Sequence, residues 1–220
     1  MNSWEIFANH TGASSMKWTH YFPIYDRHFT TWKNRSLNFL EIGVLNGGSG
    51  AIWSKFFGPM ARIIGIDIEP RCKQYETEQY KIRIGDQSDT SFLSSIIDEF
   101  GVPDIVLDDG SHHQDHIFAT FSFLYPKMKL NSIYMVEDLH TSYWASHGGS
   151  LSNPNTFMNR TKNYLDQLNT QHNNIESDPL VKDTFSICAY DSVVVFEKGR
   201  TYNKGRFDKL QHILHQCIWH

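Results

Sequence analysis

The chain has few cysteines, no long apolar run and no excess of charge of one sign. Its three cysteines, Cys72, Cys188 and Cys217, are odd in number and far apart, which argues against a disulfide framework and predicts a reducing, cytoplasmic location. No apolar run approaches the ~18 residues of a membrane-spanning helix, and no apolar leader precedes the first charged residue, Glu5. The formal net charge is −4 and the basic residues are scattered, so we expect no nucleic-acid partner.

Short apolar runs alternate with amphipathic stretches along most of the sequence. This order predicts an α/β fold in which helices cover both faces of a mostly parallel sheet, and 220 residues suffice for a single domain, 1–220. Strands are expected at 37–42, 62–68, 82–84, 105–107 and 133–136, and helices at 49–57, 88–100 and 114–128.

The two ends of the chain differ from this alternating pattern. Residues 1–36 are expected to form a helical lid, in which Tyr21, Tyr25 and Phe29 recur at helical spacing; core packing is the alternative for these aromatics. Residues 185–190 and 193–197, joined by a two-residue turn, predict a C-terminal antiparallel hairpin. A last helix is expected within 199–220, with an apolar stripe formed by Leu210, Ile213, Leu214, Cys217 and Ile218.

The run from Leu40 to Ser49 carries the strongest functional signal. It predicts a strand that ends in Glu41-Ile42-Gly43, a loop with glycines at 47 and 48, and a helix that begins near Ser49. Glycines let the backbone approach a ligand closely, and the free N–H groups of a helix start can bind it. The Gly-x-Gly-x-x-Gly spacing of dinucleotide-binding proteins is absent, whereas Glu41 suits the cationic methionine part of S-adenosylmethionine (SAM). In the alternative interpretation, Glu41 pairs with a buried lysine.

Acidic residues also follow the other predicted parallel strands, and ligands of such sheets bind beyond the carboxyl ends of the strands. Asp67 stands where a carboxylate accepts hydrogen bonds from a ribose diol, and Asp86 stands where a side chain meets adenine. Either residue could instead cap a helix. The expected cofactor contacts are Glu41, Gly43, Asn46, Gly47, Ser49, Asp67, Asp86, Gln87 and Asp108.

Three carboxylates are expected to converge where two neighbouring strands end. Asp109 follows one strand, and Glu137 and Asp138 follow the next, about 4.8 Å away. Left unpaired these groups would repel one another, and a hard divalent cation would relieve the repulsion; Mg²⁺ is expected, with Mn²⁺ or Ca²⁺ as alternatives. Pairing with lysine or helix capping is the other interpretation. His112, three residues after Asp109, is placed to act as a general base, although a structural histidine fits the pattern equally well.

Five motifs together resemble the sugar O-methyltransferases of the macrocin and mycinamicin type. They are residues 40–44 (Leu-Glu-Ile-Gly-Val), 65–68 (Gly-Ile-Asp-Ile), 85–89 (Gly-Asp-Gln-Ser-Asp), 108–112 (Asp-Asp-Gly-Ser-His) and 136–140 (Val-Glu-Asp-Leu-His). The resemblance implies a Rossmann-like class I methyltransferase fold with a mostly parallel seven-stranded sheet, and SAM as the donor. It also implies Mg²⁺ on Asp109, Glu137 and Asp138, with His112 as the base, so that His112 and Asp109 are the expected catalytic residues. The segment 12–17 departs from the Gly-Thr-Asp-Lys that the family often carries.

These features predict an O-methyltransferase that depends on SAM and Mg²⁺ and acts on a hydroxyl of a sugar, a glycosylated small molecule or a glycan. Tyr143 and Trp144 could stack on this acceptor or pack within a loop. Three alternatives remain: a catechol-like acceptor, an oxidoreductase that uses NAD or a nucleotide sugar, and a non-catalytic SAM-binding module. A homo-oligomer is compatible with the sequence.

Overall fold

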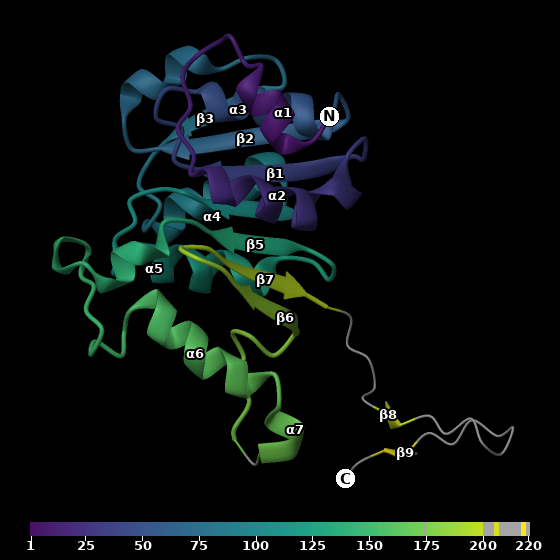
Figure 1. The fold of residues 1–220 in the computed structure, drawn as a ribbon, viewed down its shortest axis with the longest axis vertical. Coiled ribbons are helices and arrows are strands. Elements are labelled where there is room, and N and C mark those ends of the chain that lie inside the picture. Colours follow the sequence, from purple (N-terminus) through teal and green to yellow (C-terminus); the bar gives the residue numbers. More distant parts are fainter. Residues whose placement is uncertain (174, 200–204, 207–216, 219–220) are drawn as a thin grey trace, which may run out of the picture.

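A seven-stranded sheet forms the centre of the computed structural model, which describes residues 1–173, 175–199, 205–206 and 217–218 (Figure 1). The strands lie in the order β3-β2-β1-β4-β5-β7-β6. The first five of these strands are parallel, while β7 runs antiparallel to β5 and β6. Their bounds are β1 Leu37–Ile42, β2 Ala61–Asp67, β3 Tyr80–Ile84, β4 Ile105–Asp108, β5 Ile133–Val136, β6 Thr184–Ala189 and β7 Val194–Lys198. The predicted α/β fold, with its parallel sheet and terminal hairpin, is confirmed.

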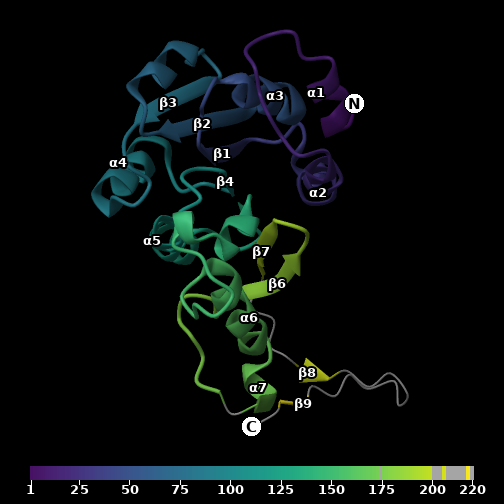
Figure 2. The same cartoon turned by 60° about the vertical axis from the view of Figure 1, so that its left-hand side comes forward.

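Alternating side chains of the strands build two apolar layers, one on each face of the sheet. In β1, Leu37 and Phe39 pack in the cluster that includes α1, α2 and α3, whereas Leu40 and Ile42 pack in the cluster of α4, α5 and α6. Figure 2 shows α2 and α3 on one side of the sheet and α4 and α5 on the other. The helices are α1 Ser3–Ala8, α2 Phe22–Phe29, α3 Gly48–Phe57, α4 Thr90–Phe100, α5 Gln114–Leu124, α6 Phe157–Gln167 and α7 Thr170–Asn173.

Two helices are shorter than the sequence predicts, each for a local chemical reason. The predicted start of α4 at 88 is wrong by two residues, because the Asp89 carboxylate caps the helix by accepting from the backbone N–H groups of Ser91 and Phe92. The predicted end of α5 at 128 is also wrong. Pro126 has no N–H to donate, and the chain continues as the 3₁₀ turn Tyr125–Lys127.

The last described residues do not form the predicted C-terminal helix. Residues 205–206 (β8, Gly205–Arg206) and 217–218 (β9, Cys217–Ile218) pair as two short antiparallel strands, so the helix prediction is wrong there. The remainder of the predicted stripe, Leu210, Ile213 and Leu214, lies outside the described residues. Among the described helices, none is both long and apolar enough to cross a membrane.

The strand register brings the expected site residues to one edge of the sheet. Asp108, the last residue of β4, stands opposite Ile42 of β1 and Val136 of β5. Asp109 and Glu137 are therefore neighbours one residue beyond these strand ends, as predicted. The order also reverses at β1, since β2 lies on one side and β4 on the other, and such a switch point is where open α/β sheets bind ligands.

Candidate functional site

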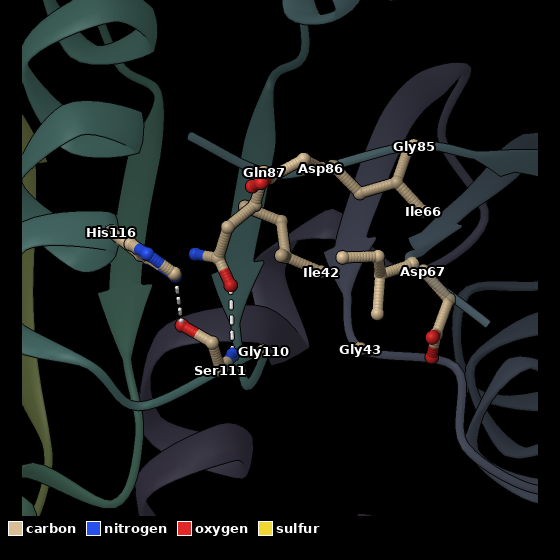
Figure 3. A pocket seen from close by; sticks show the side chains of 11 residues that line it. Ile42, Gly43, Ile66, Asp67, Gly85, Asp86, Gln87, Gly110, Ser111 and His116 are labelled. Carbon is tan, nitrogen blue, oxygen red and sulfur yellow. Dashed lines mark hydrogen bonds between the residues drawn. The ribbon is translucent and has the colours of Figure 1, made fainter. Parts of the chain in front are cut away.

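A cavity of about 180 Å³ opens beyond the carboxyl ends of β1 to β4 (Figure 3). Apolar side chains of Ile42, Ile66 and Ile68 form part of its wall. The polar and backbone lining comes from the strand ends, the loops that follow them and the start of α5: Gly43, Asp67, Gly85, Asp86, Gln87, Gly110, Ser111 and His116. Four of the predicted cofactor residues thus line one cavity, namely Gly43, Asp67, Asp86 and Gln87.

Gly43 lets two loops meet at the floor of this cavity. Its φ is +95°, and a Cβ atom there would lie 2.1 Å from the carbonyl oxygen of Asp109. Only glycine tolerates both the left-handed backbone and this close approach. The cofactor loop after β1 therefore packs directly on the loop that carries the predicted metal ligand.

Asp67 ties the end of β2 to the glycine-rich loop. Its Oδ2 accepts hydrogen bonds from the backbone N–H groups of Val44 (2.8 Å) and Leu45 (3.0 Å), and its Oδ1 accepts one from Glu69 (2.9 Å). Partial burial alone would raise the pKa of Asp67, but the three N–H donors outweigh it and lower this pKa. Asp67 is therefore a fixed, ionised acceptor on the cavity wall.

Asp86 is held on the adjoining loop by Ser88, whose backbone N–H and hydroxyl both donate to its Oδ1 at 2.8 Å. These two hydrogen bonds lower the pKa of the Asp86 carboxyl. On the same wall, the Ser111 hydroxyl lies 3.1 Å from Nδ1 of His116. His116 belongs to α5, and its place in the cavity lining was not predicted from the sequence.

Asp108 is buried below the cavity and acts through Gln87. The Gln87 amide donates to Asp108 Oδ1 (3.2 Å), and the Tyr134 hydroxyl donates to Oδ2 (3.1 Å). Gln87 then accepts the backbone N–H of Ser111 at 2.7 Å, which fixes the cavity wall. Burial raises the pKa of Asp108 to about 7. Its predicted direct contact with the cofactor stays a prediction, and its visible role is to orient Gln87.

Glu41 is also fully buried and does not line the cavity. Its carboxylate accepts from Trp53 Nε1 (3.1 Å) and lies 3.3 Å from the Tyr80 hydroxyl, which donates to it. Burial raises the pKa of Glu41 to about 7, although the nearby charge of Lys17 and a hydrogen bond from Ser49 act in the opposite direction. The buried Lys17 acts on Glu41 through its charge, whereas its ion pairs are with Asp109 and Glu137, so direct pairing of Glu41 with a lysine stays a prediction.

The other predicted cofactor residues stand at the start of α3. Half-buried Asn46 donates from Nδ2 to the Ser14 hydroxyl at 3.1 Å, which joins the glycine-rich loop to the N-terminal segment. Gly47 precedes the helix with φ +75°, and Ser49 is buried in its first turn. None of these three side chains or backbones lines the cavity as described, so their contact with a cofactor stays a prediction.

Next to the cavity, Lys17 lies between two of the predicted metal ligands. Its Nζ is 2.5 Å from Asp109 Oδ2 and 2.8 Å from Glu137 Oε2, and its side chain is 6% exposed. Burial alone would lower the pKa of Lys17, but the two carboxylates outweigh it and raise this pKa far above its ordinary value. Burial and the charge of Asp109 raise the pKa of Glu137, while Lys17 opposes them.

Two tyrosines of the N-terminal segment hold Glu137 and the third predicted metal ligand, Asp138. The Tyr25 hydroxyl donates to Glu137 Oε1 (2.5 Å), and the Tyr21 hydroxyl donates to Asp138 Oδ1 (2.6 Å). Their rings are buried in the apolar cluster below. Their rings therefore pack as core while their hydroxyls reach these carboxylates, and a lid over the cofactor or substrate stays a prediction.

Three side chains, those of Asp109, His112 and Asp138, form one group that could hold a cation, called the acidic group below. Asp109, His112 and Asp138 each offer a ligand atom within 4.8 Å of the others. His112 Nε2 lies 3.6 Å from Asp138 Oδ2 and 4.0 Å from Asp109 Oδ1. Both oxygens of Glu137 already have partners in Lys17 and Tyr25, so its predicted place as third ligand stays a prediction.

The backbone at this group is strained in a way that points to function. His112 (φ +56°) and Asp138 (φ +52°) adopt left-handed conformations that non-glycine residues rarely occupy. Such conformations cost about 1–3 kcal/mol each and persist where the surrounding structure requires a side chain to point in one direction. Here they turn the imidazole and the carboxylate toward each other.

Comparisons with known proteins agree with this geometry. The chain is 34% identical over 205 residues to mycinamicin VI 2''-O-methyltransferase from Micromonospora griseorubida, and 36% identical over 203 residues to demethylmacrocin O-methyltransferase from Streptomyces fradiae. These alignments cover 84% and 83% of this chain. The chain belongs to this family of O-methyltransferases. The resemblance seen in the sequence motifs is thus confirmed.

Solved structures of the family support the same assignment. The methyltransferase MycE of the mycinamycin pathway, in complex with Mg, SAH and mycinamycin VI, matches with a TM-score of 0.81 and 30% identity over 91% of this chain. The chain spans about half the length of these relatives, 50% of both curated proteins and 54% of the MycE chain. No protein-family model matches the sequence.

Proposed function

We propose that the chain is an O-methyltransferase that depends on SAM and Mg²⁺ and acts on a sugar hydroxyl of a glycosylated natural product. One observation carries this proposal: the cofactor cavity and the acidic group meet at Asp109, whose carbonyl packs on Gly43 and whose carboxylate faces His112. The relatives named above are O-methyltransferases, and the similar solved structure contains Mg and SAH, which supports both parts of the proposal.

SAM, when bound, would supply an activated methyl group. The cavity suits the nucleoside part of this cofactor. Asp67 lines this cavity with an ionised carboxylate, and besides the backbone N–H groups that it accepts it would accept a ribose hydroxyl. Asp86 and His116 face the same cavity and would meet the adenine ring. Glu41 does not line the cavity, so it would act on the cationic methionine part of SAM through its negative charge and not by direct contact.

The acidic group fits a hard divalent cation by the chemistry of its donors. Mg²⁺ is commonly held by one or two carboxylates and keeps several waters, and Asp109 and Asp138 supply two partly exposed carboxylates close together. Glu137 would join them if Lys17 released it. Bound there, Mg²⁺ would supply a Lewis acid that stabilises negative charge on an acceptor oxygen.

His112 is placed to take the proton of the acceptor hydroxyl at Nε2. The Asp138 carboxylate, whose Oδ2 lies 3.6 Å from this same Nε2, would stabilise the imidazolium by its negative charge once it forms. General-base catalysis of this kind contributes about 10²–10⁴-fold to a rate. The rest of the acceleration would come from holding the acceptor oxygen next to the methyl group.

Exposed aromatic rings at the rim of the acidic group would contact the acceptor. Trp18 and Trp144 are 57% and 50% exposed, and both pack near the His140 ring, with centroids 6.3 Å and 4.7 Å away. Such rings bind the apolar faces of small ligands.

A cytoplasmic location, a homo-oligomer and the lack of a nucleic-acid partner stay predictions.

Transfer of a radiolabelled methyl group tests the proposal. The chain is incubated with labelled SAM and Mg²⁺, and with mycinamicin VI, demethylmacrocin or catechol as the acceptor. We expect label on a glycosylated macrolide, its loss with EDTA, and a rate about 10²–10⁴-fold lower for His112→Gln. Label on catechol alone would favour the phenol alternative, and transfer that EDTA leaves unchanged would overturn the metal assignment.

A further inference from the structure

The N-terminal segment places the permanent positive charge of Lys17 inside the acidic site, by which we mean the carboxylates of Asp109, Glu137 and Asp138. Lys17 Nζ contacts one oxygen of Asp109, while the other oxygen of that carboxylate faces His112. Among the described residues, Lys17 is the one lysine or arginine that forms an ion pair with Asp109 or Glu137. The charge that a divalent cation would balance is therefore balanced in part by the chain itself.

The position of Lys17 is fixed by contacts on both sides of it in the sequence. Before it, Ser14 receives a hydrogen bond from Asn46, and a Cβ atom on Gly48 would lie 2.2 Å from the carbonyl oxygen of Ala13. After it, Tyr21 is held by Asp138. The lysine is thus anchored between the start of α3 and the acidic site, and its ammonium group has little freedom to leave.

We propose that Lys17 is a positioning residue that holds Asp109 and Glu137 in place and, by its charge, limits how tightly the site binds a divalent cation. The inference rests on the metal site of the function proposed above. Replacement of Lys17 by an uncharged residue leaves the buried Glu137 carboxylate, which is 1% exposed, without its counter-charge. A divalent cation would then be drawn to the site more strongly, since one repelling charge is gone.

Binding of Mn²⁺, followed by electron paramagnetic resonance in the absence of SAM and acceptor, tests this directly. We expect Lys17→Met to bind Mn²⁺ at least about tenfold more tightly than the wild type. Lys17→Arg keeps the charge and should bind as the wild type does. Lys55→Met removes an exposed lysine of α3 outside the site, and it should also leave the affinity unchanged. A merely structural role of Lys17 would not raise the affinity in this selective way.

A second pair of variants covers the case in which Lys17→Met does not fold. Glu137→Gln and the double variant Lys17→Met/Glu137→Gln bury no unpaired charge at position 137. The double variant should again bind Mn²⁺ about tenfold more tightly than Glu137→Gln alone. The same comparison can therefore be made in a background without the buried carboxylate.

The outcomes separate this inference from the proposed function. Equal or weaker Mn²⁺ binding by Lys17→Met, with measurable binding by the wild type, would overturn the role of Lys17 and leave the metal site standing. Absence of Mn²⁺ binding in the wild type and in every variant would overturn both the metal site and this inference. Tighter binding by Lys17→Met alone among the single variants would support both.

Discussion

Replacement of Tyr25 by phenylalanine should destabilise the protein through the Glu137 carboxylate. The Tyr25 ring keeps its contacts, which include an edge-to-face pair with Trp53 at 5.1 Å and a stacked pair with Phe29 at 6.1 Å. Only the hydroxyl is lost, and with it the 2.5 Å hydrogen bond to Glu137 Oε1. Because the acceptor is a buried charged group, we expect a loss of about 1.5–3 kcal/mol in the free energy of unfolding.

Urea-induced unfolding of matched variants measures this loss. Tyr125→Phe is the control, since Tyr125 is equally buried and its hydroxyl pairs at 2.8 Å with the neutral hydroxyl of Thr184. That variant should lose about 1 kcal/mol. If Tyr25→Phe costs no more than Tyr125→Phe, the hydrogen bond from Tyr25 to the Glu137 carboxylate does not stabilise the fold beyond an ordinary neutral hydrogen bond.

Three further predictions concern single groups. Asp67→Asn should weaken the binding of S-adenosylhomocysteine about 10- to 100-fold in calorimetry, because it removes a charged acceptor from the cavity; unchanged affinity would contradict its role. Burial raises the pKa of the Cys72 thiol to about 11, so maleimide at pH 8 should label it far more slowly than the half-buried Cys188, as mass spectrometry would show. The hydrogen bond from His28 lowers the pKa of Glu197, so this carboxylate stabilises the fold above its unfolded pKa and stops doing so as the pH falls through the folded value. Glu197→Gln should therefore melt below the wild type at pH 7 and together with it in strong acid.

The sequence predicts the sheet well because its strands are short apolar runs that end in acidic or glycine residues. The bounds of β1 and β5 are as predicted, and the neighbouring positions of Asp109 and Glu137 follow from the parallel order of β4 and β5. The polar residues of the cavity wall were also predicted at Asp67 and Asp86, since Asp67 ends one strand and Asp86 comes shortly after the next.

The N-terminal contribution to the site could not be predicted, because its contacts span the chain. Lys17 lies 92 residues from Asp109 and 120 from Glu137, and no local periodicity relates them. The place of Tyr25 is similar, since helical spacing predicts its buried ring but not the partner of its hydroxyl. His116 was a nearer miss: the sequence places it on the helix that follows His112, but it does not show that this side chain, near the start of α5, lines the cavity.

Calorimetric titration of SAM, with Mg²⁺ or with EDTA, tests both the cofactor cavity and the acidic group in one experiment. The wild type and Asp109→Asn are compared, with Asp98→Asn on the exposed face of α4 as the control. We expect SAM binding in all three proteins and a heat of Mg²⁺ binding in the wild type and the control only. Absence of SAM binding in the wild type would contradict the assignment of the cavity, and an undiminished Mg²⁺ heat in Asp109→Asn would contradict the assignment of the acidic group.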